Sequence, residues 1–117
     1  MKDLEIKTQA DKNGVVTVIL DGSIDAYSYS KLEEVFNKLL NQRQYKLVVD
    51  LTGVDYLNSA GAGVFIGTLG VTEENNGKIV LVNPQSAVRD VFDLLGLSKI
   101  FPIVKDKALA VHEFVAK

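Results

Sequence analysis

The sequence contains no cysteine and only one histidine, His112, among its 117 residues. The absence of cysteine excludes disulfide bonds and thiolate-bound metal, and one histidine cannot form a histidine cluster around an ion. No apolar run approaches the ~20 residues that cross a bilayer, and the charged N-terminus lacks the apolar stretch of a signal peptide. We therefore expect a cytoplasmic protein with no membrane segment, no metal and no cofactor.

Positive charge is not in excess. Thirteen Lys and Arg residues stand against 15 Asp and Glu, which gives a formal net charge of −2. Nucleic-acid-binding surfaces normally show clustered positive charge, so we expect no direct nucleic-acid contact. Hydrophobic residues at 47% and charged residues at 24% are ordinary for a globular chain. The length suits one domain over residues 1–117, and its small size and near-neutral surface favour a monomer in isolation.

The hydrophobic pattern predicts strands first. Residues 4–8 alternate apolar and polar, Asn13-Gly14 is a hairpin turn, and residues 15–20 are rich in β-branched side chains. Apolar runs at 46–51 and 79–82 are typical of buried central strands. Pro102 within 100–104 favours an edge strand. The chain therefore opens with an antiparallel hairpin and continues with strands of the parallel kind.

Four helices are predicted between and after these strands. Residues 28–41 carry apolar side chains on one helical face. A second helix over about 60–75 contains four glycines, and a third begins at 84–86 and ends at Gly96. Asp106 is predicted to cap a last helix with Ala108, Val111 and Val115 facing inward. The alternation predicts an α/β sandwich with a mixed, mainly parallel β-sheet.

Three polar segments follow predicted strands. They are residues 21–25, Asp50 with Asp55, and residues 58–63. Because ligands and partners usually meet the carboxyl ends of parallel strands, these segments are expected to form one surface patch. For Asp50 and Asp55, hydrogen bonding in loops and turns is the simpler interpretation.

Ser59 lies at the start of the glycine-containing helix, so either Ser59 or Asn58 is expected to be its N-cap. The same position suits a phosphate, because unpaired N–H groups and the helix dipole favour an anion there. Gly67 and Gly70 are expected to allow close packing between elements. Gly61 and Gly63 are expected to leave a low surface on which a partner docks closely. The spacing matches neither a P-loop nor a dinucleotide site.

Two other interpretations compete. Asp50 at the end of a central strand is where a phosphorelay receiver carries its phosphoacceptor, and Lys105 matches the receiver's lysine. The paired acids that hold Mg²⁺ have no match, since Asp21 is followed by Gly22. An enzyme is not expected, because the sequence shows no Ser-His-Asp arrangement, metal cluster or cofactor loop. His112 is expected on the surface of the last helix.

Several segments together resemble one family. They are Gly22-Ser23-Ile24-Asp25, the strand 47–51, Asn58-Ser59-Ala60-Gly61-Ala62-Gly63, and the tail segments 77–84 and 94–101. Their order and spacing are similar to those of STAS domains, and the resemblance covers nearly the whole chain. It implies a single STAS domain with a β-α superhelix, an N-terminal hairpin and a mixed sheet.

Stand-alone STAS domains are mostly anti-sigma factor antagonists, and the resemblance implies that function here. The unphosphorylated antagonist binds a serine-kinase anti-sigma factor, which frees the sigma factor. The kinase then phosphorylates a serine that matches Ser59, and a metal-dependent serine phosphatase reverses this step. The family's motif acid matches Asp25, so Asp25, Asn58, Ser59, Gly61 and Gly63 are the implied partner-binding residues.

Two residues depart from the family pattern. Asn58 stands where an aspartate is usual, which removes one negative charge beside the phosphate. Ala62 replaces a bulky aliphatic residue, which makes the contact surface shallower. A second implied function is a non-phosphorylated accessory subunit, such as the STAS proteins that accompany phospholipid-transport ATPases.

Overall fold

The first two strands form the hairpin that Asn13-Gly14 predicts. In the computed structural model, which describes residues 2–115, β1 (Glu5–Ala10) pairs antiparallel with β2 (Val15–Ile24). The turn between them is a short 3-10 segment, Lys12–Gly14. Asn13 and Gly14 have φ of 64° and 74°, the left-handed values that this dipeptide adopts readily.

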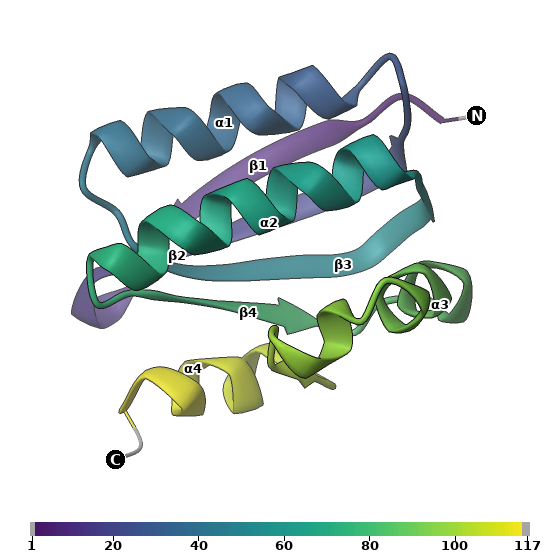
Figure 1. The fold of residues 1–117 in the computed structure, drawn as a ribbon. Helices are drawn as coiled ribbons and strands as arrows, with labels where there is room; N and C mark the ends of the chain where they lie inside the picture. The colour runs from purple at the N-terminus through teal and green to yellow at the C-terminus, as the bar shows by residue number, and fades with distance from the viewer. Residues whose placement is uncertain (1, 116–117) are drawn as a thin grey trace.

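The remaining strands are parallel to β2 and to one another. They are β3 (Lys46–Leu57), β4 (Lys78–Val82) and β5 (Ile103–Val104), and the five strands lie in the order β1-β2-β3-β4-β5. Figure 1 shows β1 at one edge of this sheet. The predicted mixed, mainly parallel sheet is confirmed, and Pro102 directly precedes the edge strand β5.

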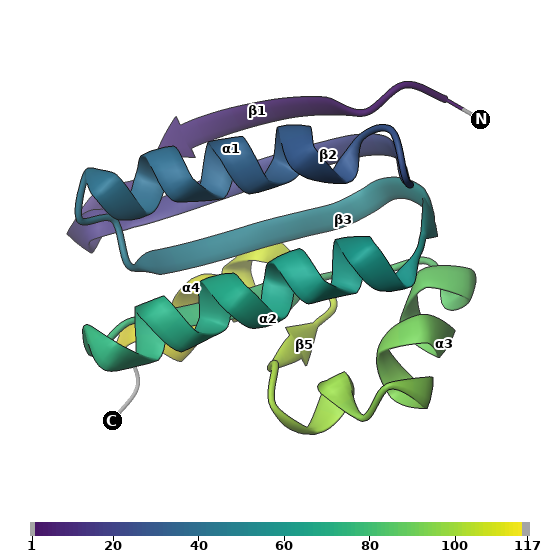
Figure 2. The same ribbon diagram turned by 45° about the horizontal axis from the view of Figure 1, so that its top comes forward.

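Helices cover both faces of the sheet. The described residues contain α1 (Tyr29–Asn41), α2 (Ser59–Glu74), α3 (Ser86–Leu94), a 3-10 turn at Leu97–Lys99 and α4 (Lys107–Val115). Figures 1 and 2 show α1 and α2 side by side on one face, and Figure 2 shows α4 behind the sheet. Within residues 2–115, no helix combines the length and the apolar character that a membrane crossing requires.

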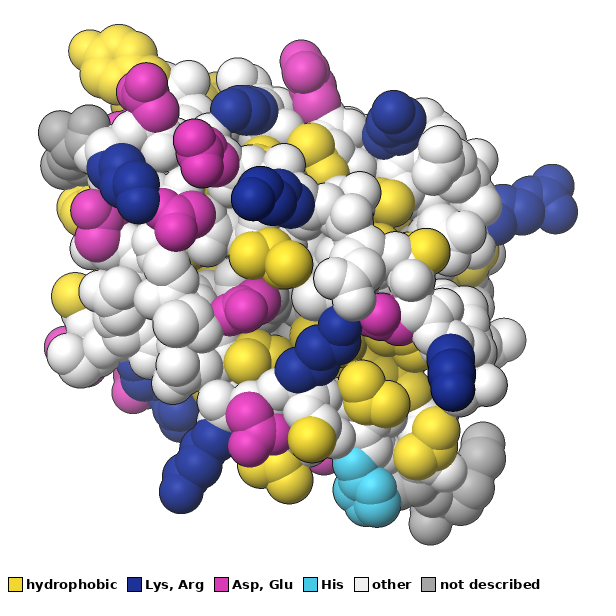
Figure 3. Space-filling view, turned by 180° about the vertical axis from the view of Figure 1, so that it is seen from behind, with side chains coloured by type: hydrophobic (Ala, Val, Ile, Leu, Met, Phe, Trp, Pro, Cys, Tyr) yellow, Lys and Arg dark blue, Asp and Glu magenta, His cyan; other side chains and the backbone are white. Residues whose placement is uncertain are grey.

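The alternation of side chains along β3 explains why the core has two layers. Leu47 and Val49 belong to the larger cluster beneath α1, α2 and α3, whereas Val48 belongs to the cluster beneath α4. Successive strand residues point to opposite faces, so an uninterrupted apolar run serves both layers. In Figure 3, which views the α4 side, hydrophobic side chains gather toward the lower part and charged side chains are interspersed above.

Four phenylalanines fix the helices on the larger core. Phe65 of α2 contacts Phe36, Phe92 and Phe101 edge-to-face, with ring centroids 5.6, 5.6 and 6.3 Å apart. Edge-to-face pairs add to the stability that burial alone gives. All four rings are almost fully buried. The position of α2, and therefore of its first residues, is set by this cluster.

Two strands extend further than the sequence pattern predicts. β2 continues through Asp21-Gly22 to Ile24, and β3 continues past Leu51 to Leu57, with register shifts after Ile19 and Gly22. The loop interpretation of Asp50 and Asp55 is therefore wrong, because both lie within β3. Polar residues and glycine are typical of turns, but pairing between the parallel strands β2 and β3 keeps the backbone extended in these segments.

The predicted inner face of the last helix is also wrong. Asp106 does cap α4, accepting a hydrogen bond from the Leu109 N–H at 2.9 Å. However, Ala110 is the buried residue, Phe114 packs beside it, and Ala108 and Val115 are exposed. Ala110 and Phe114 lie four residues apart, so they share the helix face that packs on the valines of the smaller core cluster. His112 is exposed, as expected.

Candidate functional site at the carboxyl ends of β2 and β3

Asn58 caps the N-terminus of α2. Its side-chain Oδ1 accepts a hydrogen bond from the Gly61 N–H at 2.8 Å, and its backbone oxygen accepts one from the Ala62 N–H at 3.0 Å. The Asn58 N–H in turn donates to the Ile24 oxygen at the end of β2, at 3.0 Å. Of the two residues that the sequence offered as caps, Asn58 is therefore the one that acts as the cap.

Ser59 is the first residue of α2, and it is exposed. Because Asn58 satisfies the Gly61 and Ala62 donors, the N–H groups of Ser59 and Ala60 are left without an acceptor within the described part of the chain. The first N–H groups of a helix have no partner inside it and attract anions. The Ser59 hydroxyl therefore stands beside two free donors and open solvent.

The glycines of α2 separate into two kinds. A Cβ on Gly61 would lie 2.5 Å from Ile24 Cγ2 and 2.7 Å from Leu57 Cδ1, so the helix start approaches β2 and β3 closely. Gly61 is buried and cannot offer a docking surface, contrary to expectation. Gly63, Gly67 and Gly70 are exposed, and a Cβ on any of them would meet nothing within 4 Å, so the close packing expected at Gly67 and Gly70 is wrong.

Asp25 organises the turn between β2 and α1. Its Oδ1 accepts hydrogen bonds from the N–H groups of Tyr27 and Ser28 at 2.9 and 3.1 Å. Ser28 Oγ accepts from the Asp25 N–H at 2.9 Å and donates to the Ser23 oxygen at 2.7 Å. Asp25 is half-buried and shapes the loop beside the α2 N-terminus.

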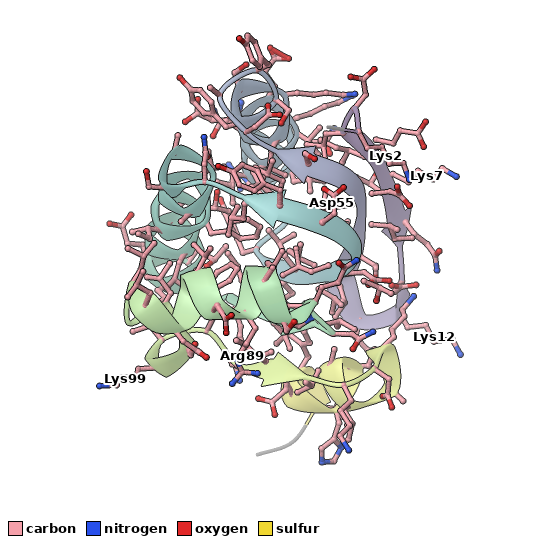
Figure 4. The ribbon with its side chains drawn as sticks, turned by 90° about the vertical axis from the view of Figure 1, so that its right-hand side faces the viewer. Lys2, Lys7, Lys12, Asp55, Arg89 and Lys99 are labelled. Carbon is pink, nitrogen blue, oxygen red and sulfur yellow. The ribbon has the colours of Figure 1, made fainter. Side chains whose placement is uncertain are left out.

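A second polar contact joins the ends of β2 and β3. The buried Ser23 donates its hydroxyl proton to Asp55 Oδ1 at 2.7 Å. Figure 4 shows Asp55 on β3, at the end of the sheet that faces the viewer. Gly22 precedes this contact with φ of 120°, and a Cβ there would lie 2.2 Å from the Asp3 oxygen. Only glycine lets the N-terminal segment lie this close to β2.

A surface hollow of about 700 Å³ lies beside these contacts. Asp25, Asn58 and Lys31 line it, together with Tyr27 and Tyr56, two residues that belong to none of the predicted motifs. The Tyr27 side chain is 94% exposed and Tyr56 is 41% exposed. Aromatic residues with free faces are typical of protein interfaces. No sequence pattern marks them, because their exposure depends on where the turn and the strand end.

Lys2 also lines the hollow, where it pairs with Asp21. The hydrogen bond to Asp21, and then the charge of that carboxylate, raise the pKa of the Lys2 ammonium. Lys31 donates to the Leu4 oxygen at 2.6 Å. Lys2 thus ties the N-terminal segment to β2, and Lys31 ties it to α1, so the rim of the hollow carries charges of both signs.

Asp50 lies outside the expected patch. It is the last β3 residue paired with β4, opposite Val82, and its carboxylate accepts from the Thr52 N–H at 3.0 Å. It lines a separate hollow of about 280 Å³ that Lys105 also lines. Of the predicted segments, Ser23 with Asp25, Asp55 and Asn58 therefore lie together at this end of the sheet, and Asp50 lies apart from them. Among residues 2–115, no three His, Cys, Asp or Glu side chains gather as metal ligands would.

Comparison with known proteins identifies relatives of this chain. A family model described as the STAS domain matches residues 7–110. The anti-sigma-B factor antagonist of Staphylococcus epidermidis is 28% identical over 86 residues, which cover 74% of this chain and 80% of that protein. An anti-sigma factor antagonist from Mycobacterium paratuberculosis has a structure that matches with a TM-score of 0.85 and 26% identity, over 95% of this chain and 93% of that one.

The Bacillus protein SpoIIAA has the same fold and has been solved in two states. Its unphosphorylated form, an anti-sigma factor antagonist, matches with a TM-score of 0.85 and 18% identity over 97% of this chain and 98% of that one. Its phosphorylated form matches with a TM-score of 0.75 and 18% identity over 94% and 99%. At this identity the likeness concerns the fold.

Proposed function

Because this chain belongs to the STAS domain family, we propose that it is an anti-sigma factor antagonist switched by phosphorylation of Ser59. In its unphosphorylated form it binds a serine-kinase anti-sigma factor, and the sigma factor is released. The kinase phosphorylates Ser59 with ATP, which ends the interaction, and a metal-dependent serine phosphatase restores it. The antagonist itself catalyses no step. The names of the relatives in Staphylococcus and Mycobacterium support this function.

The observation that carries the proposal is the geometry of Ser59. The hydroxyl is exposed at the first position of α2, beside the free N–H groups of Ser59 and Ala60. A phosphate there adds about −1.5 to −2 charges at neutral pH. The free donors and the helix dipole stabilise that charge, so the phosphorylated protein stays folded. A kinase can therefore modify Ser59 without unfolding its surroundings.

The surface beside Ser59 supports its use as a docking site. Tyr27 and Tyr56 offer aromatic faces around the hollow, and Asn58 and Asp25 form its polar part. A partner that covers this surface also covers the start of α2, and a phosphate on Ser59 then has to be desolvated at the interface. Desolvating an unpaired charge is costly, so phosphorylation weakens binding sharply.

Asn58 adjusts this switch. Its carbonyl oxygen caps Gly61, so an aspartate at the same position would keep the cap and add a negative charge beside the phosphate. With asparagine, less negative charge gathers at the α2 N-terminus after phosphorylation. We therefore expect weaker repulsion of the partner than in family members with aspartate, and a kinase whose recognition surface suits the neutral amide.

The experiment uses the anti-sigma factor serine kinases encoded in the same genome. Each is incubated with the protein and Mg-ATP, and intact mass and peptide mapping identify the modified residue. Ser86 supplies a matched control, because it is also an exposed serine at the first position of a helix, α3. We expect one phosphate on the wild type and on Ser86→Ala, and none on Ser59→Ala.

Binding is measured on the same proteins by titration calorimetry. We expect Ser59→Ala to bind the kinase persistently in the presence of ATP, and Ser59→Asp to bind weakly, whereas Ser86→Asp binds as the wild type does. Labelling of Ser86 instead of Ser59, or equal affinity of the phosphorylated and unphosphorylated forms, would contradict the switch. Absence of labelling with recovery of a transport ATPase would favour the accessory-subunit function instead.

A further inference from the structure

The outer edge of the sheet at β1 carries hydrogen-bonding groups without partners. The Asp11 N–H donates to the Val15 oxygen at 2.8 Å, and the register continues unbroken from Ala10 opposite Val16 to Glu5 opposite Asp21. In an antiparallel ladder, alternate residues direct their backbone groups at the neighbouring strand. The odd-numbered residues of β1 therefore face β2. The backbone groups of Ile6, Thr8 and Ala10 point away from the sheet, and no described residue satisfies them.

The side chains of β1 divide between two faces. Ile6 is half-buried on the α1 face, where it packs with Val35 against the larger core. Ile6, Thr8 and Val35 line a hollow of about 350 Å³ between β1 and α1. Glu5 and Lys7 are exposed on the opposite face, and neither forms an ion pair within residues 2–115. Figure 4 shows Lys7 projecting outward from β1, away from the helices.

We propose that two copies of this chain associate through antiparallel pairing of their β1 strands, centred on Ile6. In this register Ile6 lies opposite the partner's Ile6, and Glu5 lies opposite the partner's Lys7 on both sides of the axis. The outward N–H and C=O groups of the two Ile6 residues bond to each other. The Thr8 N–H reaches the partner's Leu4 carbonyl, which accepts from Lys31 and has a second lone pair.

Charge selects this register over its neighbours. Centring on Lys7 would place two lysines directly opposite each other, which is destabilising across paired strands. Centring on Thr8 would place Glu5 opposite the partner's Asp11. Only the Ile6-centred register pairs opposite charges and also aligns the outward backbone groups. This complementarity identifies the occupant of the edge as a second copy rather than an unrelated strand.

The strand is short, which limits the strength of the dimer. Six residues of edge and the adjoining side of α1 bury a small interface, of the size that weak, transient complexes have. The chain is therefore monomeric when dilute, as its composition suggests, and pairs when it is concentrated. The proposal does not rest on the function of Ser59, which lies on α2, although Leu4 and Lys31 also line the hollow beside that helix.

The test uses the opposite charges of Glu5 and Lys7. In Glu5→Lys alone, and in Lys7→Glu alone, like charges face each other across the axis, so each variant is expected to stay monomeric. An equimolar mixture of the two variants restores opposite charges at both positions and is expected to form a heterodimer. Sedimentation equilibrium from micromolar to millimolar protein measures each state, with wild type expected to dimerise at the upper end.

A backbone variant tests the hydrogen bonds. Thr8→Pro removes an outward N–H that β2 does not use, and proline is tolerated on edge strands. Thr8→Val keeps the N–H and is the matched control. We expect Thr8→Pro to abolish dimerisation and Thr8→Val to retain it. A wild type that stays monomeric at millimolar concentration, or a dimer that neither charge variant weakens, would overturn the proposal. So would a mixture that remains monomeric.

Discussion

Replacing Gly61 by alanine tests how tightly the start of α2 is held against the sheet. The added Cβ would lie 2.5 Å from Ile24 Cγ2 and 2.7 Å from Leu57 Cδ1, and both side chains are buried. Distances this short require the neighbours to move. Gly63→Ala is the matched control, because its Cβ would meet nothing within 4 Å.

The two variants share one effect and differ in another. Alanine in a helix is favoured over glycine by up to about 1 kcal/mol, and this gain is somewhat smaller in the first turn. Forcing extra volume into a packed site costs about 1–3 kcal/mol. Gly63→Ala is therefore expected to raise the free energy of unfolding by about 0.5–1 kcal/mol. The free energy of unfolding of Gly61→Ala is expected to be about 1–3 kcal/mol lower than that of Gly63→Ala.

Urea unfolding followed by circular dichroism measures both free energies on proteins prepared in parallel. The slope of the transition should be the same for both variants, because neither changes the surface exposed on unfolding. If Gly61→Ala stabilised the protein as much as Gly63→Ala does, the close approach of α2 to Ile24 and Leu57 would be refuted.

Three further predictions concern the cap, the docking surface and the opposite side of the sheet. Asn58→Ala removes the hydrogen bond from the Gly61 N–H and should lower the free energy of unfolding by about 1 kcal/mol. Asn58→Asp should keep this hydrogen bond and the stability that it gives, and urea unfolding compares the two variants. Tyr27→Ala should leave stability unchanged, because the ring is exposed, yet weaken binding of the anti-sigma kinase by at least about tenfold in calorimetry. Hydrogen bonds, chiefly from Thr17, and the nearby Lys107 lower the pKa of Asp11 below its usual 3.8. The stabilisation from Asp11 is thus present above that value and lost as pH falls through the lower folded pKa. Asp11→Asn should make the free energy of unfolding depend less on pH in this range and should leave its pH dependence elsewhere unchanged.

The sequence predicts the architecture well because its signals are strong and local. The Asn13-Gly14 turn, the apolar runs of β3 and β4, and Gly96 beyond α3 all lie where the pattern places them. Gly96 has φ of 75°, as a helix C-terminus requires. These features depend on backbone conformation and burial, which a short window of residues determines.

The site is only partly visible in the sequence, because it depends on distant pairing. The sequence places Ser59 and Asn58 at the start of α2, and the structure confirms this position. It does not show that Asp55 belongs to a strand, since that depends on a ladder with β2 that begins far earlier in the chain. Gly61 and Gly67 look alike in the sequence, but one faces the sheet and the other faces solvent.

A phosphate on Ser59 is proposed to control binding of the partner, and affinity tests this most directly. The measurement compares the anti-sigma kinase's affinity for the unphosphorylated protein with its affinity for protein phosphorylated enzymatically at Ser59, each form verified by intact mass. We predict tight binding of the first form and binding of the second that is weaker by at least about a hundredfold, as desolvation of an interfacial charge produces. Equal affinities for the two forms would contradict control by Ser59.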